Sequence, residues 1–370
     1  MIRKIHPNSD GPRIPGASKA TRPPAMGLAL AAMLLLASLP CRAEPLPKLA
    51  VPSEGAYTGA YVDFGDTEDD VTRDAIDRFA EMTGKKPAIV ASSSYWGRQD
   101  FPTRNVKVIT KAGAVPLIYW SPWDKPYVED RLPDRFSLTS ILDGKWDAYI
   151  DSWADAAKAT GVPILVSFCN EMNGNWFPWS GIYYGKGRLK DGKPRGPETF
   201  KKAWRHVVDR VRARGATNIS WVFHVMDYPY PNTKWNMMGM YYPGSDYVDW
   251  LGLSVYGKQF GNEPWVSFAD VMDYPFGEIA RLDPDKPIML AEWGIGEFPE
   301  AGSKADWIAE AFRSMTGRDR LKAAVFWHER WQNEDESYSN LRVNSSPGAL
   351  EAYRRGVASP FWLSKPRLRE

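Results

Sequence analysis

The sequence predicts an α/β protein built as a (β/α)8 barrel in a single domain, on three observations. From about residue 57 onward, short apolar runs alternate with longer amphipathic stretches, a rhythm typical of βα units around a parallel sheet. The apolar runs number eight, and their count and spacing fit a barrel better than an open doubly wound sheet. No G-x-G-x-x-G follows the first strand and no P-loop occurs, which excludes the usual nucleotide-binding folds and predicts no nucleotide partner.

The expected strands are the eight short runs rich in apolar residues. They are 56–64, 86–94, 115–120, 162–168, 218–225, 248–256, 286–293 and 322–329. Between them lie helical patterns, of which 69–84, 146–161 and 197–215 each end on a glycine, the residue preferred just past a helix C-terminus. The Gly-, Pro- and Lys-rich segment 183–197 is expected to be a long loop after the fourth strand.

Residues 1–43 have the features of an export signal. Five basic residues precede the apolar run 26–40, which is too short for a comfortable transmembrane helix, and small residues favour cleavage after Ala43. We therefore expect a secreted or periplasmic protein whose barrel domain is 44–370, with an uncleaved membrane anchor as the alternative. Cleavage would leave Cys169 as the one cysteine, so an intramolecular disulfide is not expected.

The net charge indicates no charged partner, whereas the aromatic content indicates a sugar ligand. Lys and Arg total 47 against 45 for Asp and Glu, so bulk charge gives no case for a nucleic acid or an anionic membrane as partner. The chain also holds 17 Trp and 17 Tyr. Core packing accounts for part of this set, and the remaining rings would suit stacking against the C–H faces of sugar rings. A polysaccharide is therefore the expected partner.

Two glutamates end strongly apolar strands, where burial of an acidic side chain is unfavourable unless it has a function. Glu171 follows ILVSFCN and Glu292 follows PIMLA, on the fourth and seventh expected strands. Side chains just past the C-terminal strand ends of a barrel converge on one pocket. Hydrolysis of a glycosidic bond with retention needs two carboxyl groups about 5 Å apart, one as acid/base and one as nucleophile. The pair therefore predicts a retaining glycoside hydrolase.

Three blocks of sequence resemble glycoside hydrolase family 26. They are SFCNEMNGNWFPWSG (167–181), YYPGSDYVDWLGLSVYG (241–257) and KPIMLAEWG (286–294), and the resemblance covers nearly all of the chain after residue 43. It implies that Glu171 is the acid/base, that Glu292 is the nucleophile and that Tyr256 hydrogen-bonds the nucleophile. It also implies that the Trp176 and Trp327 rings line the cleft near the scissile bond.

The pocket face carries further candidates for substrate binding. In full, the expected contacts are Asn170, Trp176, Tyr256, Trp327, Trp120, Trp123, Trp179, His224 and His328. We expect the Tyr256 hydroxyl to keep the pKa of Glu292 low, and the rings of Trp176, Phe177 and Trp179 to raise the pKa of Glu171. His224 and His328 share this face, but no H-x-x-x-H or cysteine pair accompanies them, so neither a metal nor another cofactor is expected.

One departure from the resemblance concerns the substrate. Mannanases of the family typically carry a histidine before the acid/base and another after the third strand, whereas this chain has Asn170 in the first place and none in the second. The expected function is thus a retaining endo-β-glycanase acting on β-1,4-mannan or mixed-linkage β-glucan. The alternatives are a periplasmic hydrolase that trims the organism's own exopolysaccharide and a glycan-binding barrel without turnover.

Overall fold

The computed structural model describes residues 46–126, 132–333 and 335–369. All of these residues belong to one compact unit. The expected export signal and its cleavage after Ala43 lie outside the described residues, so both stay predictions. Within the described ranges, no helix combines the length and the apolar character that crossing a bilayer would require.

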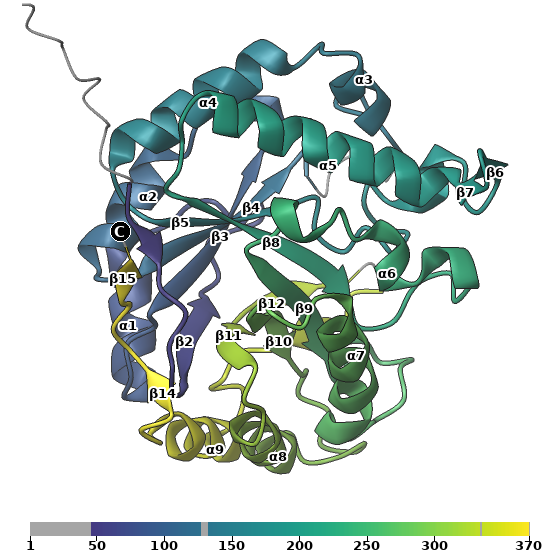
Figure 1. Ribbon diagram of the computed structural model, residues 1–370. Helices are drawn as coiled ribbons and strands as arrows, with labels where there is room; N and C mark the ends of the chain where they lie inside the picture. The colour runs from purple at the N-terminus through teal and green to yellow at the C-terminus, as the bar shows by residue number, and fades with distance from the viewer. Residues whose placement is uncertain (1–45, 127–131, 334, 370) are drawn as a thin grey trace, which may run out of the picture. The chain divides into compact units, whose positions relative to one another are not determined.

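Eight parallel strands close into the predicted barrel (Figure 1). They are β2 (Ala56–Tyr61), β3 (Ile89–Tyr95), β4 (Val115–Ser121), β5 (Ile164–Phe168), β8 (Ile219–Met226), β9 (Trp250–Tyr256), β10 (Ile288–Gly294) and β11 (Leu321–Trp327). Each strand pairs with the next along the chain, and β11 closes the ring against β2 with Ala324 opposite Thr58. The predicted fold class is confirmed, and the strands fall within or beside the predicted runs.

Helices alternate with the strands and cover the outside of the barrel (Figure 1). The longer ones are α1 (Arg73–Thr83), α2 (Thr103–Lys111), α4 (Asp147–Thr160), α5 (Arg195–Ala213), α7 (Phe268–Leu282), α8 (Lys304–Thr316) and α9 (Pro347–Val357). As predicted, Gly84 and Gly161 cap α1 and α4 in the left-handed conformation, with φ of 75° and 65°. Serine or threonine side chains accept a backbone N–H at several N-termini, including Thr72 before α1.

Short elements occupy the loops at the two ends of the barrel. They are β1 (Lys48–Leu49), which pairs with β15 (Leu368–Arg369); the hairpins β6 (Leu189–Lys190) with β7 (Lys193–Pro194) and β12 (Arg330–Gln332) with β13 (Tyr338–Asn340); and the helices α3 (Leu138–Leu142) and α6 (Met238–Tyr241). The short strand β14 (Trp362–Leu363) pairs in parallel with β2 and so extends the barrel sheet. The segment predicted as one long loop, 183–197, therefore contains the hairpin β6–β7 and the start of α5, which begins at Arg195 directly after Pro194.

Much of the aromatic content packs between the barrel and its helices. The Trp120 ring lies parallel to Trp153, with ring centroids 4.1 Å apart, and Trp96 packs against both Trp120 and Phe168. On the opposite side Trp293 packs edge-on against Phe326 at 4.8 Å. Large buried rings contribute most of the apolar burial that stabilises such a shell, so the strand ends that carry the site are held by a rigid surround.

Candidate active site

A hollow opens at the carboxyl ends of the barrel strands. Its outer part is a cleft of about 1350 Å³ between the loops, and its deepest part narrows to about 70 Å³ between the strand ends. Seven of the predicted site residues line one or both parts. They are Asn170, Glu171, Trp123, Trp176, Tyr256, Glu292 and Trp327. The structure therefore brings together side chains from five different βα units, as the barrel topology predicts.

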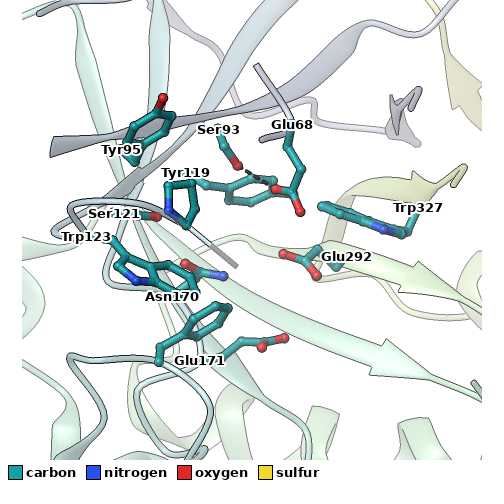
Figure 2. A pocket seen from close by; sticks show the side chains of 12 residues that line it. Glu68, Ser93, Tyr95, Tyr119, Ser121, Trp123, Asn170, Glu171, Glu292 and Trp327 are labelled. Atoms are coloured by element: carbon teal, nitrogen blue, oxygen red, sulfur yellow. Dashed lines mark hydrogen bonds between the residues drawn. The ribbon is translucent and has the colours of Figure 1, made fainter. Parts of the chain in front are cut away.

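Glu171 and Glu292 face each other across this hollow (Figure 2). Glu171 comes three positions after β5 ends, and Glu292 lies within β10 at an irregularity of the ladder with β9. A carboxylate oxygen of one lies within 4.8 Å of a carboxylate oxygen of the other, and both side chains are buried. This separation fits the spacing of retaining glycosidases and is too short for the water that an inverting enzyme places between its carboxyl groups.

The chain makes a constrained turn to present Glu171. Cys169 and Glu171 both have φ of +53°, the left-handed region that is unfavourable for residues with a side chain. Two hydrogen bonds hold this turn: the Glu171 N–H donates to the carbonyl of His224 at 2.9 Å, and the Trp179 indole donates to the carbonyl of Asn170 at 2.6 Å. Backbone strain that the surroundings enforce in this way is a frequent feature of functional sites.

Each carboxyl group receives a hydrogen bond from an aromatic side chain. The Trp176 indole N–H donates to Glu171 at 2.8 Å, and the Tyr256 hydroxyl donates to Glu292 at 2.8 Å. The second contact agrees with the one that the family resemblance implies for Tyr256. Because both donors favour the charged form of their partner, they orient the carboxyl groups and oppose the effect of burial.

The pKa of Glu171 shifts in the expected direction, whereas that of Glu292 does not. Burial raises the pKa of both carboxyl groups, and the neighbouring charge of Glu171 raises the pKa of Glu292 further. The predicted low pKa of Glu292 is therefore wrong for the free protein, since burial outweighs the donation from Tyr256. The pKa of Glu171 is raised by burial, as expected, and the hydrogen bond from the Trp176 N–H opposes that rise. Two buried carboxyl groups this close share one proton over a broad pH range.

Two tryptophans expected at the cleft belong to the core instead. Trp120 is fully buried, stacks on Trp153 and donates its indole N–H to the Tyr149 hydroxyl at 3.0 Å. Trp179 is 1% exposed and supports the turn at Asn170. Neither ring reaches the hollow, so both are corrected from substrate contacts to structural residues. For Trp120 the cause is strand geometry: neighbouring side chains point to opposite faces, and its neighbour Tyr119 is the residue that faces inward.

The two histidines are likewise corrected. His328 packs edge-on against Phe79, and its Nδ1 accepts the N–H of Val343 at 3.0 Å. His224 does point into the barrel, but it lies below the hollow with no exposed surface. Burial lowers the pKa of each imidazole to about 3, so both rings are neutral at ordinary pH. Neither one lines the hollow that a sugar could enter.

One group of side chains has the composition of a metal site. Single ligand atoms of Glu171, His224 and Glu292 lie within 4.8 Å of one another. However, both ring nitrogens of His224 already have serine hydroxyl partners, at 3.0 Å and 2.8 Å. A ring so engaged has no free lone pair to direct at an ion, so this donor set does not fit a metal.

Sequence reasoning missed two further acids in the hollow. The Glu68 carboxyl, in the loop after β2, accepts a hydrogen bond from the Ser93 hydroxyl at 2.6 Å and points toward Glu292 and Trp327 (Figure 2). Glu329 follows β11 and accepts the Trp327 indole N–H at 2.6 Å. Burial, and then the charge of Glu68, raise the pKa of Glu329 to about 8. Glu68 lies among four acids in five residues, and the sequence alone does not single it out.

Fold and site together define a (β/α)8 barrel of the glycoside hydrolase type. Residues 121–292 match the profile of Glycosyl hydrolase family 26. The chain is 33% identical over 327 residues to Endoglucanase H of Acetivibrio thermocellus, covering 85% of this chain and 32% of that protein. It is 26% identical over 296 residues to a mannan endo-1,4-beta-mannosidase of Bacillus subtilis, covering 72% of each. The chain belongs to glycoside hydrolase family 26.

Solved structures agree on the fold. The modular endo-beta-1,4-mannanase from Cellulomonas fimi superposes with a TM-score of 0.59 at 19% identity, covering 85% of this chain and 73% of that one. The Bacillus subtilis mannanase gives a TM-score of 0.56 at 18% identity, with coverage of 84% and 87%. The chain spans about a third to a half of the first relatives that it matches, among them a beta-1,3-xylanase of a Vibrio species.

The buried neutral His328 gives a prediction for stability against pH. Its pKa of about 3 lies below the value of roughly 6.5 in an unfolded chain. Between these two pH values the unfolded state therefore binds one more proton than the folded state. The free energy of unfolding therefore falls as the pH drops from about 6.5. In His328→Gln this slope should be smaller by up to about 1.4 kcal/mol per pH unit, as measured by urea unfolding at several pH values. An unchanged slope would contradict the assignment.

Proposed function

We propose that this protein is a retaining endo-β-glycanase that hydrolyses an uncharged β-linked polysaccharide by double displacement. The observation that carries the proposal is the approach of the Glu171 and Glu292 carboxyl groups to within 4.8 Å at the end of a closed barrel. A sugar at the scissile position would lie between them, with one carboxyl group on the leaving oxygen and the other below the anomeric carbon.

The shared proton suits this chemistry. In the first step Glu171 gives its proton to the leaving oxygen while ionised Glu292 attacks the anomeric carbon, and a glycosyl-enzyme ester forms. The ester removes the charge of Glu292, so Glu171 then holds its own negative charge more easily. In the second step Glu171 takes a proton from water, and the water oxygen attacks the anomeric carbon and releases Glu292. The donors Trp176 and Tyr256 hold the two groups through both steps.

The shape of the cleft supports an endo mode of attack. The rings of Trp123, Trp176, Trp327 and Trp331 line it on several sides, and Phe260 lies at its rim. Trp327 itself stacks on Tyr61, with ring centroids 4.1 Å apart, so it offers one face to a ligand. Rings spread along an open cleft can bind several sugar units in succession.

The charge of the cleft supports a neutral substrate. Besides the central pair, five acids line it, of which Asp63 is paired with Arg342 and Glu329 is mostly protonated near neutral pH; the others are Asp66, Glu68 and Glu263. Arg330 is the one basic lining residue among those described. A polyanion such as a nucleic acid or a uronate-rich polymer would meet repulsion along this surface. Carboxylates also make good acceptors for the hydroxyl groups of an uncharged sugar.

Among neutral polymers we favour a β-glucan with β-1,4 linkages over mannan. Asn170 replaces the histidine that family mannanases typically carry before the acid/base, and it lines the deep pocket beside Glu171. Identity is 33% to Endoglucanase H and 26% to the Bacillus subtilis mannosidase. Mannan is the second candidate, because the mannosidase is matched over 72% of its length.

We also propose that the protein is exported, with residues 1–43 removed. The support is the basic start, the apolar run 26–40 and the small residues before position 44. An extracellular location would suit a foraging enzyme, and a periplasmic location would suit one that trims the organism's own exopolysaccharide. The mass of the protein recovered from an exporting host tests the cleavage: an intact leader would leave the anchored form as the better interpretation.

A substrate panel tests the proposed activity. With purified protein, release of reducing ends is expected to be fastest on mixed-linkage β-glucan such as lichenan, slower on mannan and weakest on a uronate-rich polymer. Only the uronate-rich polymer carries negative charge that the acidic cleft would repel. The anomer released first, followed by NMR, should keep the β configuration. Release of the α anomer would contradict the retaining mechanism, and binding without any hydrolysis would favour the non-catalytic alternative.

Substitution of the two glutamates tests their separate roles. Glu292→Ala should lower the hydrolysis rate by about 10³-fold or more while polysaccharide binding stays measurable. Glu171→Ala should also be slow on polysaccharide but retain activity on aryl glycosides with good leaving groups, where added azide should speed turnover and yield a β-glycosyl azide. Glu81→Ala, on the exposed face of α1, serves as a control with normal activity. Full activity in Glu292→Ala would overturn the assignment.

A further inference from the structure

Three polar side chains lie buried beneath Glu171, outside the hollow. Ser167, His224 and Ser254 come from β5, β8 and β9, which are neighbours in the barrel, and each has no exposed surface. Polar groups inside an apolar barrel are costly unless each one is hydrogen-bonded. Their presence at this depth therefore calls for a function beyond packing.

These side chains form a continuous hydrogen-bonded chain that ends on Glu171. The Ser167 hydroxyl lies 3.0 Å from His224 Nδ1, and His224 Nε2 lies 2.8 Å from the Ser254 hydroxyl. A ring nitrogen of His224 and a carboxylate oxygen of Glu171 lie within 4.8 Å of each other, and the Ser254 hydroxyl acts on Glu171 as a hydrogen-bond donor that lowers its pKa. The chain thus links the floor of the barrel to one of the two acids in the hollow.

Hydrogen-bond accounting fixes the direction of this chain. A neutral imidazole donates from one ring nitrogen and accepts at the other. In the described part of the protein the Ser167 hydroxyl has no other hydrogen-bond partner, so its proton is satisfied only when it donates to Nδ1. Nε2 then carries the proton of His224 and donates to Ser254. The Ser254 hydrogen is left to point at Glu171.

We propose that Ser254, held by His224 and Ser167, is a positioning residue that keeps an O–H donor aimed at Glu171 throughout the reaction. This inference rests on the proposed function, in which Glu171 alternates between acid and base. The donor stabilises the carboxylate that appears once Glu171 has given up its proton, and it fixes the carboxyl group for the return of a proton from water. Because the three hydrogen-bonded side chains are buried and already in place, they need no rearrangement when Glu171 loses its proton.

Other groups also face Glu171 and enter its titration. Glu292 from β10, Tyr256 from β9, Tyr119 from β4 and Asp227 from the loop after β8 all interact electrostatically with it. The Trp176 indole donates to it from the loop after β5. None of these groups changes when Ser254 is replaced, so a difference between wild type and variant reports on the missing hydroxyl.

The test is the titration of Glu171 in the full chain with and without the Ser254 hydroxyl. Carboxyl carbons of ¹³C-labelled glutamate are followed by NMR against pH, and the signal of Glu171 is assigned by its loss in Glu171→Gln. In Ser254→Ala the midpoint should rise by about one pH unit, because a donor to the charged form has been removed. On lichenan the alkaline limb of the pH profile of kcat/KM should shift to higher pH by the same amount, since the acid stays protonated to higher pH.

Two further variants complete the design. Ser140→Ala removes another buried serine hydroxyl, on α3, and should leave the midpoint where it is. His224→Phe should raise the midpoint in the same direction, and the double variant with Ser254→Ala should add nothing further, because both act through one donor. If His224→Phe does not fold, the comparison of Ser254→Ala with Ser140→Ala stands by itself.

A midpoint in Ser254→Ala that stays unchanged or falls would overturn the proposal, since the hydroxyl would then not be a donor to the carboxylate. The NMR titration needs no substrate and no turnover. If the wild-type protein hydrolyses nothing in the panel, the proposed function fails while the direction of the hydrogen-bonded chain is still measured. If hydrolysis occurs but the midpoint does not move, the function stands and this inference fails.

Discussion

Much of the site is organised by the burial of two carboxyl groups within 4.8 Å of each other. Burial raises the pKa of each, and their mutual repulsion disfavours the state in which both are charged. Each therefore needs a donor that favours its charged form, and the structure supplies Trp176 for Glu171 and Tyr256 for Glu292, with Ser254 as the further donor proposed for Glu171. These donors come from the β5 loop and from β9, so the pair depends on strands and loops far apart in the sequence.

The barrel keeps the donors and the two carboxyl groups in position by fixing the strand ends that carry them. Trp96, Trp120 and Trp153 fill the space between the strands and the helices on one side, and Trp293 and Phe326 fill it on the other. A tightly packed surround of this kind resists small displacements. The strained left-handed turn at Glu171 is held in addition by its own N–H bond to the His224 carbonyl and by the Trp179 indole.

Sequence reasoning predicted the barrel and the two glutamates because both follow from strong local signals. Period and count define the strands, and an acid at the end of an apolar run is conspicuous. Trp120 was misplaced because the exact phase of a strand decides which of two neighbours faces inward, and here Tyr119 does so. Glu68 was missed because it reaches the hollow from a loop, where no periodicity indicates the direction of a side chain.

The raised pKa values have a cost in folding. A carboxyl group that binds its proton more tightly in the folded than in the unfolded chain weakens the folded state as the pH rises between the two pKa values. Glu171, Glu292 and Glu329 all fall in this class. The hollow is thus a local source of instability that the aromatic shell must outweigh. Stability surrendered at the site in this way is a common trade-off in proteins whose function requires buried charge.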